Sequence, residues 1–208
     1  RRENPLSTLI RSDASFLALG SVREEEEEDI LRLIVEVRKT RPKTCIGLVP
    51  RHMHRIEAWG RLLDQYAGQV DLAWTKRSWI KEPVLPGTII LWDVFGELSD
   101  VYGLARAAFV GGSLKPLGGQ NFLEPLAHGL VPVTGPSWEN FHWVGKEIVE
   151  QGLVKVASSA EACQEDILHA LKRAPSASSI RKRFLAYLQS RRGGAGVAAG
   201  AIAHRLSR

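Results

Sequence analysis

Short apolar runs alternate with longer amphipathic stretches from about residue 15 to residue 190 of this 208-residue chain. The runs have the length of β-strands and the stretches between them have the length of helices, which is typical of strand-helix units that build a parallel sheet. The pattern therefore predicts an α/β fold, a doubly wound Rossmann-like domain with a parallel sheet. Strands are predicted at residues 16–19, 44–49, 70–74, 88–91, 108–111, 131–133 and 153–156.

The stretches between these strands predict the helices. The first helix is expected to have Ser21 as its N-cap and to continue through the acidic run at 24–29, whose negative charge suits the positive end of a helix dipole. We interpret that run as structural. The other helices are predicted at residues 55–66, 95–105, 121–128, 141–150, 160–173 and 180–191.

Length and composition bound the organisation of the chain. With 44% hydrophobic and 25% charged residues, the composition is that of an average globular protein and excludes disordered and fibrous classes. The length predicts a single domain over residues 1–208, with the Gly- and Ala-rich segment 193–208 loosely ordered. No apolar run is long enough to span a membrane, so we expect a soluble chain. The chain opens at Arg1 without a methionine, which suggests a piece of a longer protein.

The charge distribution and the two cysteines indicate which binding partners and which redox compartment suit this chain. Residues 172–208 hold nine Lys and Arg and no Asp or Glu, whereas the rest of the chain holds 19 basic and 23 acidic residues. Such a basic segment suits an anionic membrane surface or nucleic acid, but the solvated face of a terminal helix explains it as well, and we favour that interpretation. Cys45 and Cys163 have neither metal-ligand nor redox spacing, which predicts buried thiols in a reducing compartment and no disulfide.

Ligands of open α/β sheets bind beyond the carboxyl ends of the strands. The turns after the predicted strands, at residues 20–21, 48–52, 93–98 and 111–125, are therefore the candidates for a site. Arg51 directly follows a predicted buried strand, where a guanidinium needs an anion and can bind a phosphate or carboxylate at two points. The alternative is a surface arginine or one paired with an internal Asp. His52 and His54 are interpreted as exposed loop residues, not metal ligands.

A second candidate is the glycine pair Gly118 and Gly119 before a predicted helix. These residues let the chain pass close to a ligand, and the N–H groups that follow can hold a phosphate or a carboxylate. Paired glycines also make tight turns, and Asn121 with Glu124 three positions later forms a capping box that needs no ligand. Spacing alone leaves both interpretations open.

The order of these segments resembles the 3-deoxy-D-manno-octulosonic acid (Kdo) transferase family. The resemblance runs from about residue 16 to residue 141 and is dense from residue 93 onward. It is carried by the residues at 48–52, 96–98, 102–105, 108–114, 118–125, 127–129, 132–133, 135–136 and 140–141.

The resemblance implies an inverting glycosyltransferase of the GT-B architecture, which transfers Kdo from CMP-Kdo to the lipid A precursor in lipopolysaccharide biosynthesis. This chain corresponds to its C-terminal, donor-binding domain. The acceptor domain, the catalytic base and the membrane anchor would lie outside it, so we expect no catalytic residue here and no transfer by this chain alone. The whole protein would act at the cytoplasmic face of the bacterial inner membrane. No metal, cofactor or nucleic acid is implied.

The resemblance also assigns donor contacts to particular positions. The family's Pro-Arg pair, its segment ending in Gly-Glu and its Asn-x-x-Glu segment hold CMP, and the glycine pair and the first loop lie beside them. The predicted contacts are Pro50, Arg51, Phe95, Gly96, Glu97, Gly118, Gly119, Asn121, Phe122, Leu123 and Glu124, with Ser21 as a further candidate.

The chain departs from the family pattern at two places. Gln120 and Phe122 stand where the family usually has His and Pro, and the first loop lacks the family's His and Gly, so no sugar contact is assigned to Val22 or Glu24. Two alternatives remain. One is another GT-B nucleotide-sugar enzyme, such as a UDP-sugar transferase or an epimerase, and the other is a non-catalytic nucleotide-binding module.

Overall fold

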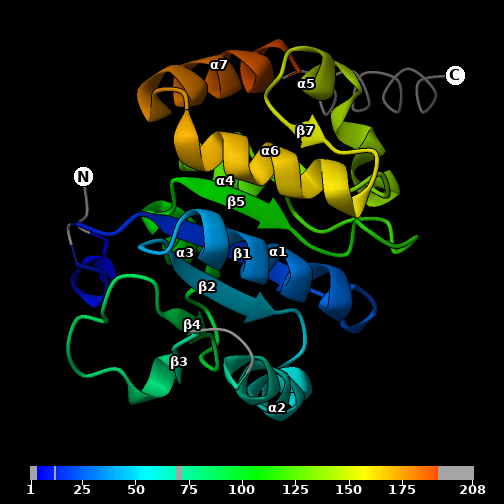
Figure 1. Ribbon diagram of the computed structural model, residues 1–208. Helices are drawn as coiled ribbons and strands as arrows, with labels where there is room; N and C mark the ends of the chain where they lie inside the picture. Colours follow the sequence, from blue (N-terminus) through cyan, green and yellow to red (C-terminus); the bar gives the residue numbers. More distant parts are fainter. Residues whose placement is uncertain (1–3, 12, 69–71, 192–208) are drawn as a thin grey trace, which may run out of the picture.

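A parallel sheet of seven strands runs through the centre of the molecule (Figure 1). The computed structural model describes residues 4–11, 13–68 and 72–191, and the sheet and helix counts refer to this part of the chain. The strand order is β3-β4-β2-β1-β5-β6-β7. The strands are β1 Phe16–Val22, β2 Cys45–Pro50, β3 Trp74–Lys76, β4 Ile89–Leu91, β5 Ala107–Val110, β6 Val133–Thr134 and β7 Lys155–Val156.

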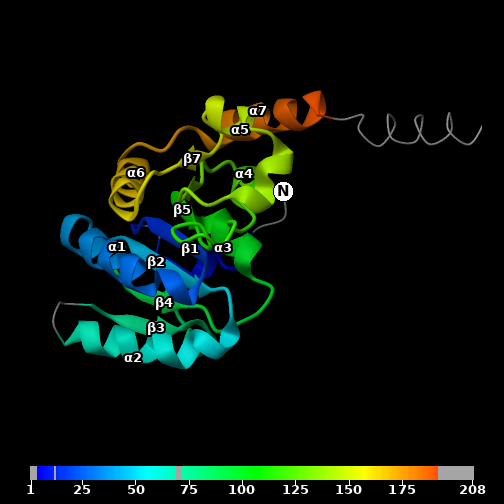
Figure 2. The ribbon, with the colours of Figure 1, turned by 90° about the vertical axis from the view of Figure 1, so that its right-hand side faces the viewer.

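Helices cover both faces of the sheet, as Figure 2 shows from the side. The α-helices are α1 Glu27–Thr40, α2 Ile56–Ala67, α3 Leu98–Leu104, α4 Leu123–Ala127, α5 Glu147–Glu150, α6 Ala160–Lys172 and α7 Ala177–Ser190. Short 3₁₀ turns occupy Ser7–Leu9, Glu24–Glu26, Met53–Arg55, Arg77–Trp79 and Glu139–Val144. No helix in the described ranges is both long and apolar enough to cross a membrane.

Alternation along the central strand divides the core into two parts. Leu17 and Leu19 of β1 point to one face and pack with α1, α2 and α6, whereas Phe16 and Ala18 point to the other and pack with α3, α4, α5 and α7. Successive side chains of a strand face opposite sides, so a strand buried on both faces is apolar throughout. The predicted doubly wound α/β fold is confirmed.

The boundaries of the predicted elements are largely right, with three corrections. The strand predicted at 70–74 begins at Trp74. The helix predicted at 141–150 is instead two pieces, Glu139–Val144 and α5, separated by Gly145 at φ 99°. Ser21 is not an N-cap, because it lies inside β1 with φ 57°, and the N-cap of the first turn is Arg23, two residues later. The segment predicted to be loosely ordered, 193–208, lies outside the described residues.

The direction of chain progression reverses at β1. From β1 the chain builds β2, β4 and β3 on one side and then returns to place β5, β6 and β7 on the other. The loops that leave β1 and β5 therefore run apart from adjacent strands. A reversal of this kind creates the crevice in which open α/β sheets bind ligands.

Candidate functional site at the carboxyl edge of the sheet

The turns chosen from the sequence meet at one edge of the sheet. Gly20 pairs with Val49 on one side and with Val110 on the other, and Val110 pairs with Thr134. Since all these strands are parallel, the turns that follow them emerge together. The edge also includes the β4–α3 turn, because Leu48 of β2 pairs with Leu91 of β4.

A buried glutamate ties the first turn to the turn after β5. The Glu26 carboxylate is 0% exposed and accepts the backbone N–H groups of Gly112, Ser113 and Leu114 at 2.7, 2.8 and 2.9 Å. It also accepts the N–H of Arg23 at 3.0 Å. Consecutive N–H groups turned toward one point form an anion-binding concavity, and here the protein's own carboxylate fills it. The acidic run is thus structural, as predicted, but its most important member had not been singled out.

The glycine pair is held by the protein itself. Gly118 and Gly119 have φ of 83° and 77°, as a tight turn requires. Their N–H groups donate to Ser137 Oγ and to the Gly112 carbonyl, and the N–H of Gln120 donates to Gly111. These three amides are therefore occupied, and the argument that they hold a phosphate does not apply to the structure described. In a donor site, Gly118 and Gly119 would contribute space, because they have no side chains to block the approach of a ligand to the backbone.

Arg51 lies at the rim of this edge with its side chain exposed. Its backbone N–H donates to Val22 at 2.8 Å, which fixes where the side chain leaves the sheet. The premise that burial would force this guanidinium to find an anion is wrong, since the side chain reaches solvent. Among the described residues no carboxylate forms an ion pair with it, so its charge is available to a ligand.

Three more cationic or titratable groups lie near Arg51. Arg23 follows Val22, whose strand partner is Pro50, so Arg23 and Arg51 leave neighbouring strands at the same level. The pKa of His52 is lowered. Burial is the largest cause, followed by the positive charges of Arg23, His54 and Arg51. The rings of His52 and His54 are stacked with centroids 5.4 Å apart. Arg23 also pairs with Glu25 Oε1 at 3.6 Å, so the positive charge of this corner comes mainly from Arg51.

The β4–α3 turn presents one exposed and one anchored candidate. Phe95 is 80% exposed, and Gly96 beside it has open space where a side chain would be. Glu97 instead points back into the protein, where Arg77 contacts both its oxygens at 2.9 and 3.0 Å and the Trp92 indole donates to it at 2.9 Å. The carboxylate of Glu97 is therefore already bound by the protein, a role that the sequence did not indicate.

The Asn-x-x-Glu segment is ordered by its own side chains. Asn121 accepts the N–H of Leu123 at 3.0 Å and donates its side-chain amide to Glu124 Oε1 at 2.9 Å. The predicted capping box is thus replaced by a side-chain pair, since Glu124 bonds the amide of Asn121 and not its backbone. Burial, followed by the charge of Glu124, raises the pKa of the Tyr102 hydroxyl beneath this segment.

Phe122 supports this segment from inside. Its side chain is fully buried and packs on Phe141 and Trp138, with ring centroids 5.0 and 6.1 Å away. A donor contact from Phe122 would therefore have to come from its main chain. Pro50 is also buried, so it shapes the turn before Arg51 more than it offers surface.

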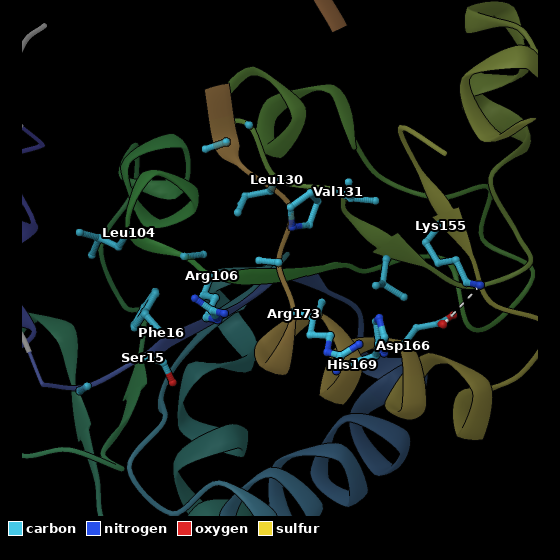
Figure 3. A pocket seen from close by; sticks show the side chains of 18 of the residues that line it. Ser15, Phe16, Leu104, Arg106, Leu130, Val131, Lys155, Asp166, His169 and Arg173 are labelled. Carbon is cyan, nitrogen blue, oxygen red and sulfur yellow. Dashed lines mark ion pairs between the residues drawn. The ribbon is translucent and has the colours of Figure 1, made fainter. Parts of the chain in front are cut away.

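A cavity of about 770 Å³ lies at the opposite edge of the sheet, among the amino ends of β1, β5 and β6 (Figure 3). Arg106 in this cavity donates to the carbonyls of Leu171 and Lys172 at the end of α6, and Lys155 pairs with Asp166 at 3.4 Å. Its volume suits a small molecule. Its position does not match that of the predicted donor contacts, and parallel α/β sheets bind ligands at the other edge.

No group of three or more His, Cys, Asp or Glu is placed to hold a metal ion in the described part of the chain. Cys45 and Cys163 are both free and buried. Burial raises the pKa of both thiols. Neither thiol lies among the predicted donor contacts.

Comparison with known proteins identifies relatives of this chain. No protein-family model matches it. It is 34% identical over 168 residues to the 3-deoxy-D-manno-octulosonic acid transferase of Haemophilus influenzae, covering 80% of this chain and 38% of the relative. It is 32% identical over 127 residues to the transferase of the same name from Aquifex aeolicus, covering 61% and 33%. The chain thus matches little more than a third of the length of these relatives.

The fold has a solved counterpart as well. It is similar to the crystal structure of the C-terminal CMP-Kdo binding domain of WaaA from Acinetobacter baumannii, with a TM-score of 0.74 and 26% sequence identity. The match covers 86% of this chain and 91% of that domain. Sequence and fold agree on the same group of proteins, as the resemblance predicted. The chain is a homologue of the Kdo transferases.

Proposed function

We propose that this chain is the donor domain of a Kdo transferase and binds CMP-Kdo at the carboxyl edge of its sheet. The single observation that carries the proposal is the convergence of the predicted CMP contacts at one edge of the sheet. The turns holding Arg51 and Phe95–Glu97 follow the adjacent strands β2 and β4, and the turn holding 121–124 follows β5, which only β1 separates from β2. The relatives named above support the same donor, since one is a 3-deoxy-D-manno-octulosonic acid transferase and the solved counterpart is a CMP-Kdo binding domain.

Each proposed contact has a chemical role that its surroundings allow. Arg51 would supply positive charge to the single phosphate of CMP, and the exposed Phe95 would offer a face to the nucleotide. Glu124 would accept ribose hydroxyls with the oxygen that Asn121 leaves free. Gly96, Gly118 and Gly119 would let the donor approach the backbone, and Pro50, Glu97, Asn121, Phe122 and Leu123 would hold the contacting groups in place. Ser21 remains a candidate at the centre of the edge.

The reaction we propose for the whole protein is an inverting displacement. An acceptor hydroxyl of the lipid A precursor attacks the anomeric carbon of Kdo, a carboxylate base removes its proton, and CMP leaves. This chain would hold the leaving group and stabilise its developing charge through Arg51. The base and the acceptor would belong to another domain, so this chain alone would transfer nothing. No metal is proposed.

The location proposed for the whole protein is the cytoplasmic face of the bacterial inner membrane. Within the described part, α7 carries Arg181, Lys182 and Arg183 and has no acidic residue in its first turn. Cationic side chains of this kind are attracted to anionic lipid surfaces. Segment 172–208 would therefore add to membrane attachment.

The test is a calorimetric titration of the chain with CMP, UMP and AMP. A Kdo transferase donor domain should bind CMP at least about tenfold more tightly than the other two, a difference of about 1.4 kcal/mol. A preference for UMP would favour a UDP-sugar enzyme. Equal affinity for all three nucleotides would favour a non-selective binding module and contradict the proposal.

A further inference from the structure

We infer that Glu26 is a positioning residue: its buried carboxylate fixes the turn after β5 and, through it, the loops that carry the glycine pair. Glu26 touches neither the glycine pair nor any predicted donor contact. Its effect on ligand binding would pass through hydrogen bonds. The inference rests on the proposed function only where it concerns CMP.

The carboxylate is buried and has hydrogen-bond donors on several sides. It is fully buried and makes four hydrogen bonds to backbone N–H groups, at 2.7, 2.8, 2.9 and 3.0 Å. A buried carboxylate is expensive unless such bonds compensate its lost hydration. Three of the donors are consecutive, and Gly112 among them has φ 67°, which favours a residue without a side chain. The N–H groups of the turn therefore compensate the buried charge of Glu26, and Glu26 supplies the acceptor that these N–H groups require.

The turn that Glu26 holds is the root of a chain of hydrogen bonds. The carbonyl of Gly112 accepts from Gly119, and the carbonyl of Ser113 accepts from Ser137. Ser137 Oγ in turn accepts from Gly118, and the carbonyl of Gly118 accepts from Asn140. Two separate routes thus connect Glu26 to the glycine pair: two hydrogen bonds lead to Gly119 through Gly112, and three lead to Gly118 through Ser113 and Ser137.

An ion pair fixes the same turn from outside. Lys115 Nζ lies 2.8 Å from Asp29 on the first turn of α1, and this hydrogen bond, with the charge of Asp29, raises the pKa of Lys115. Asp29 and Glu26 are three residues apart on the same helical start. The N-terminal end of α1 therefore contacts the turn after β5 at two points, through the buried Glu26 and through the ion pair of Asp29 with Lys115.

The filled concavity also limits where the donor can bind. Three N–H groups in a row would attract the phosphate of a nucleotide if they were empty. Because Glu26 occupies them, an incoming phosphate would have to displace a buried carboxylate. The donor's phosphate is directed instead toward the rim, where Arg51 lies.

The first test removes the carboxylate and offers a substitute. In Glu26→Ala, CMP affinity measured well below the melting temperature should fall about tenfold, because the buried N–H groups lose their partner and no longer fix the turn that holds the glycine pair. Added formate should restore both the affinity and the melting temperature. Glu28→Ala, which removes an exposed glutamate that pairs with Arg32, is the matched control and should respond to formate as the wild type does. Glu26→Gln keeps the volume and one acceptor oxygen, and carries the test if the alanine variant does not fold.

The second measurement separates positioning from stability. If Glu26 only stabilises the fold, the melting temperature will fall and recover while CMP affinity stays unchanged throughout, and the inference is overturned. Amide hydrogen exchange tests the inference without a nucleotide. Relative to the wild type, the exchange rates of the Gly118 and Gly119 amides should increase in the Glu26 variants far more than the exchange rates of amides in α7. A wild type that does not bind CMP would sink the proposed function, whereas unchanged exchange at the glycine pair would sink this inference.

Discussion

At the scale of single residues, Arg51 is the clearest candidate for a ligand contact. It is exposed at the site edge without a carboxylate partner in the described part of the chain, and a charge-assisted hydrogen bond to phosphate contributes about 1.5–3 kcal/mol. Arg51→Ala should therefore weaken CMP binding about 10- to 100-fold in calorimetry. Arg61→Ala, an exposed arginine on α2, should leave it unchanged. Equal affinity in a folded Arg51 variant would make it a surface residue.

Glu124 distinguishes a structural carboxylate from a ribose ligand. Asn121 donates to Glu124 Oε1, and no hydrogen bond from another residue of the described part reaches Oε2, which is available to hydroxyl groups. Glu124→Ala should weaken CMP much more than it weakens 2′,3′-dideoxy-CMP, since only the former can use the lost acceptor. Affinities for both ligands should be recorded beside the melting temperature of each protein. An equal loss for both ligands would leave Glu124 only the role of ordering its turn.

His52 predicts a pH dependence of stability. Its pKa in the fold lies below the ordinary value of 6.5, because burial and the neighbouring cations disfavour the imidazolium. The unfolded chain therefore takes up the proton first. The free energy of unfolding is therefore highest, as far as His52 is concerned, above pH 6.5. It decreases as the pH falls from 6.5 toward the lower pKa of His52 in the folded protein. His52→Gln should show a smaller loss of unfolding free energy over that window in denaturant titrations, and identical pH profiles would contradict this account.

At the scale of elements, the β4–α3 turn combines an exposed tip with an anchored base. Removing Arg77 would leave Glu97 with only the Trp92 indole. Arg77→Ala should lower the unfolding free energy by about 1–3 kcal/mol, because a partly buried charge loses its partner. Its effect on CMP affinity should be smaller than that of Arg51→Ala. A loss of affinity as large as that of Arg51→Ala would mean that Arg77 itself meets the ligand.

The elements show what the sequence could predict and what it could not. Periodicity predicted the parallel sheet and most boundaries, because each strand and helix carries its own pattern. Glu26 escaped prediction because its partners lie 86 to 88 residues away, and five consecutive glutamates look alike along the chain. One signal was present: Glu26 lies four residues before the buried Ile30, on the face of the helix turned to the core.

The same reasoning explains the misjudged site details. The sequence leaves open whether the amides around Gly118 and Gly119 are free for an anion or belong to a tight turn, because a helix start normally has unpaired amides. The acceptors that use them, Ser137 Oγ and the carbonyls of Gly111 and Gly112, come from loops whose approach depends on the tertiary fold. Ser21 has the composition of an N-cap, but the pairing of β1 with β2 extends past it. At Ser21 and at the glycine pair, contacts with residues distant in the sequence decide the conformation, and the local sequence preference does not.

At the scale of the whole molecule, two opposite edges of one sheet compete as ligand sites. The carboxyl edge holds the positively charged corner around Arg51 and the residues assigned by the resemblance. The amino edge holds a cavity of about 770 Å³, whose lining includes Arg106, Lys155, His169 and Arg173. The topology favours the carboxyl edge, because the loops leaving β1 and β5 separate there.

The most direct test is to map the position of bound CMP by amide chemical shifts in the isotope-labelled chain. The account predicts saturable changes at Arg51, Gly96, Asn121 and Glu124, with little change at Arg106, Lys155, His169 and Arg173. Changes centred on those four cavity residues, with the carboxyl edge unaffected, would contradict the proposal that this edge binds the donor.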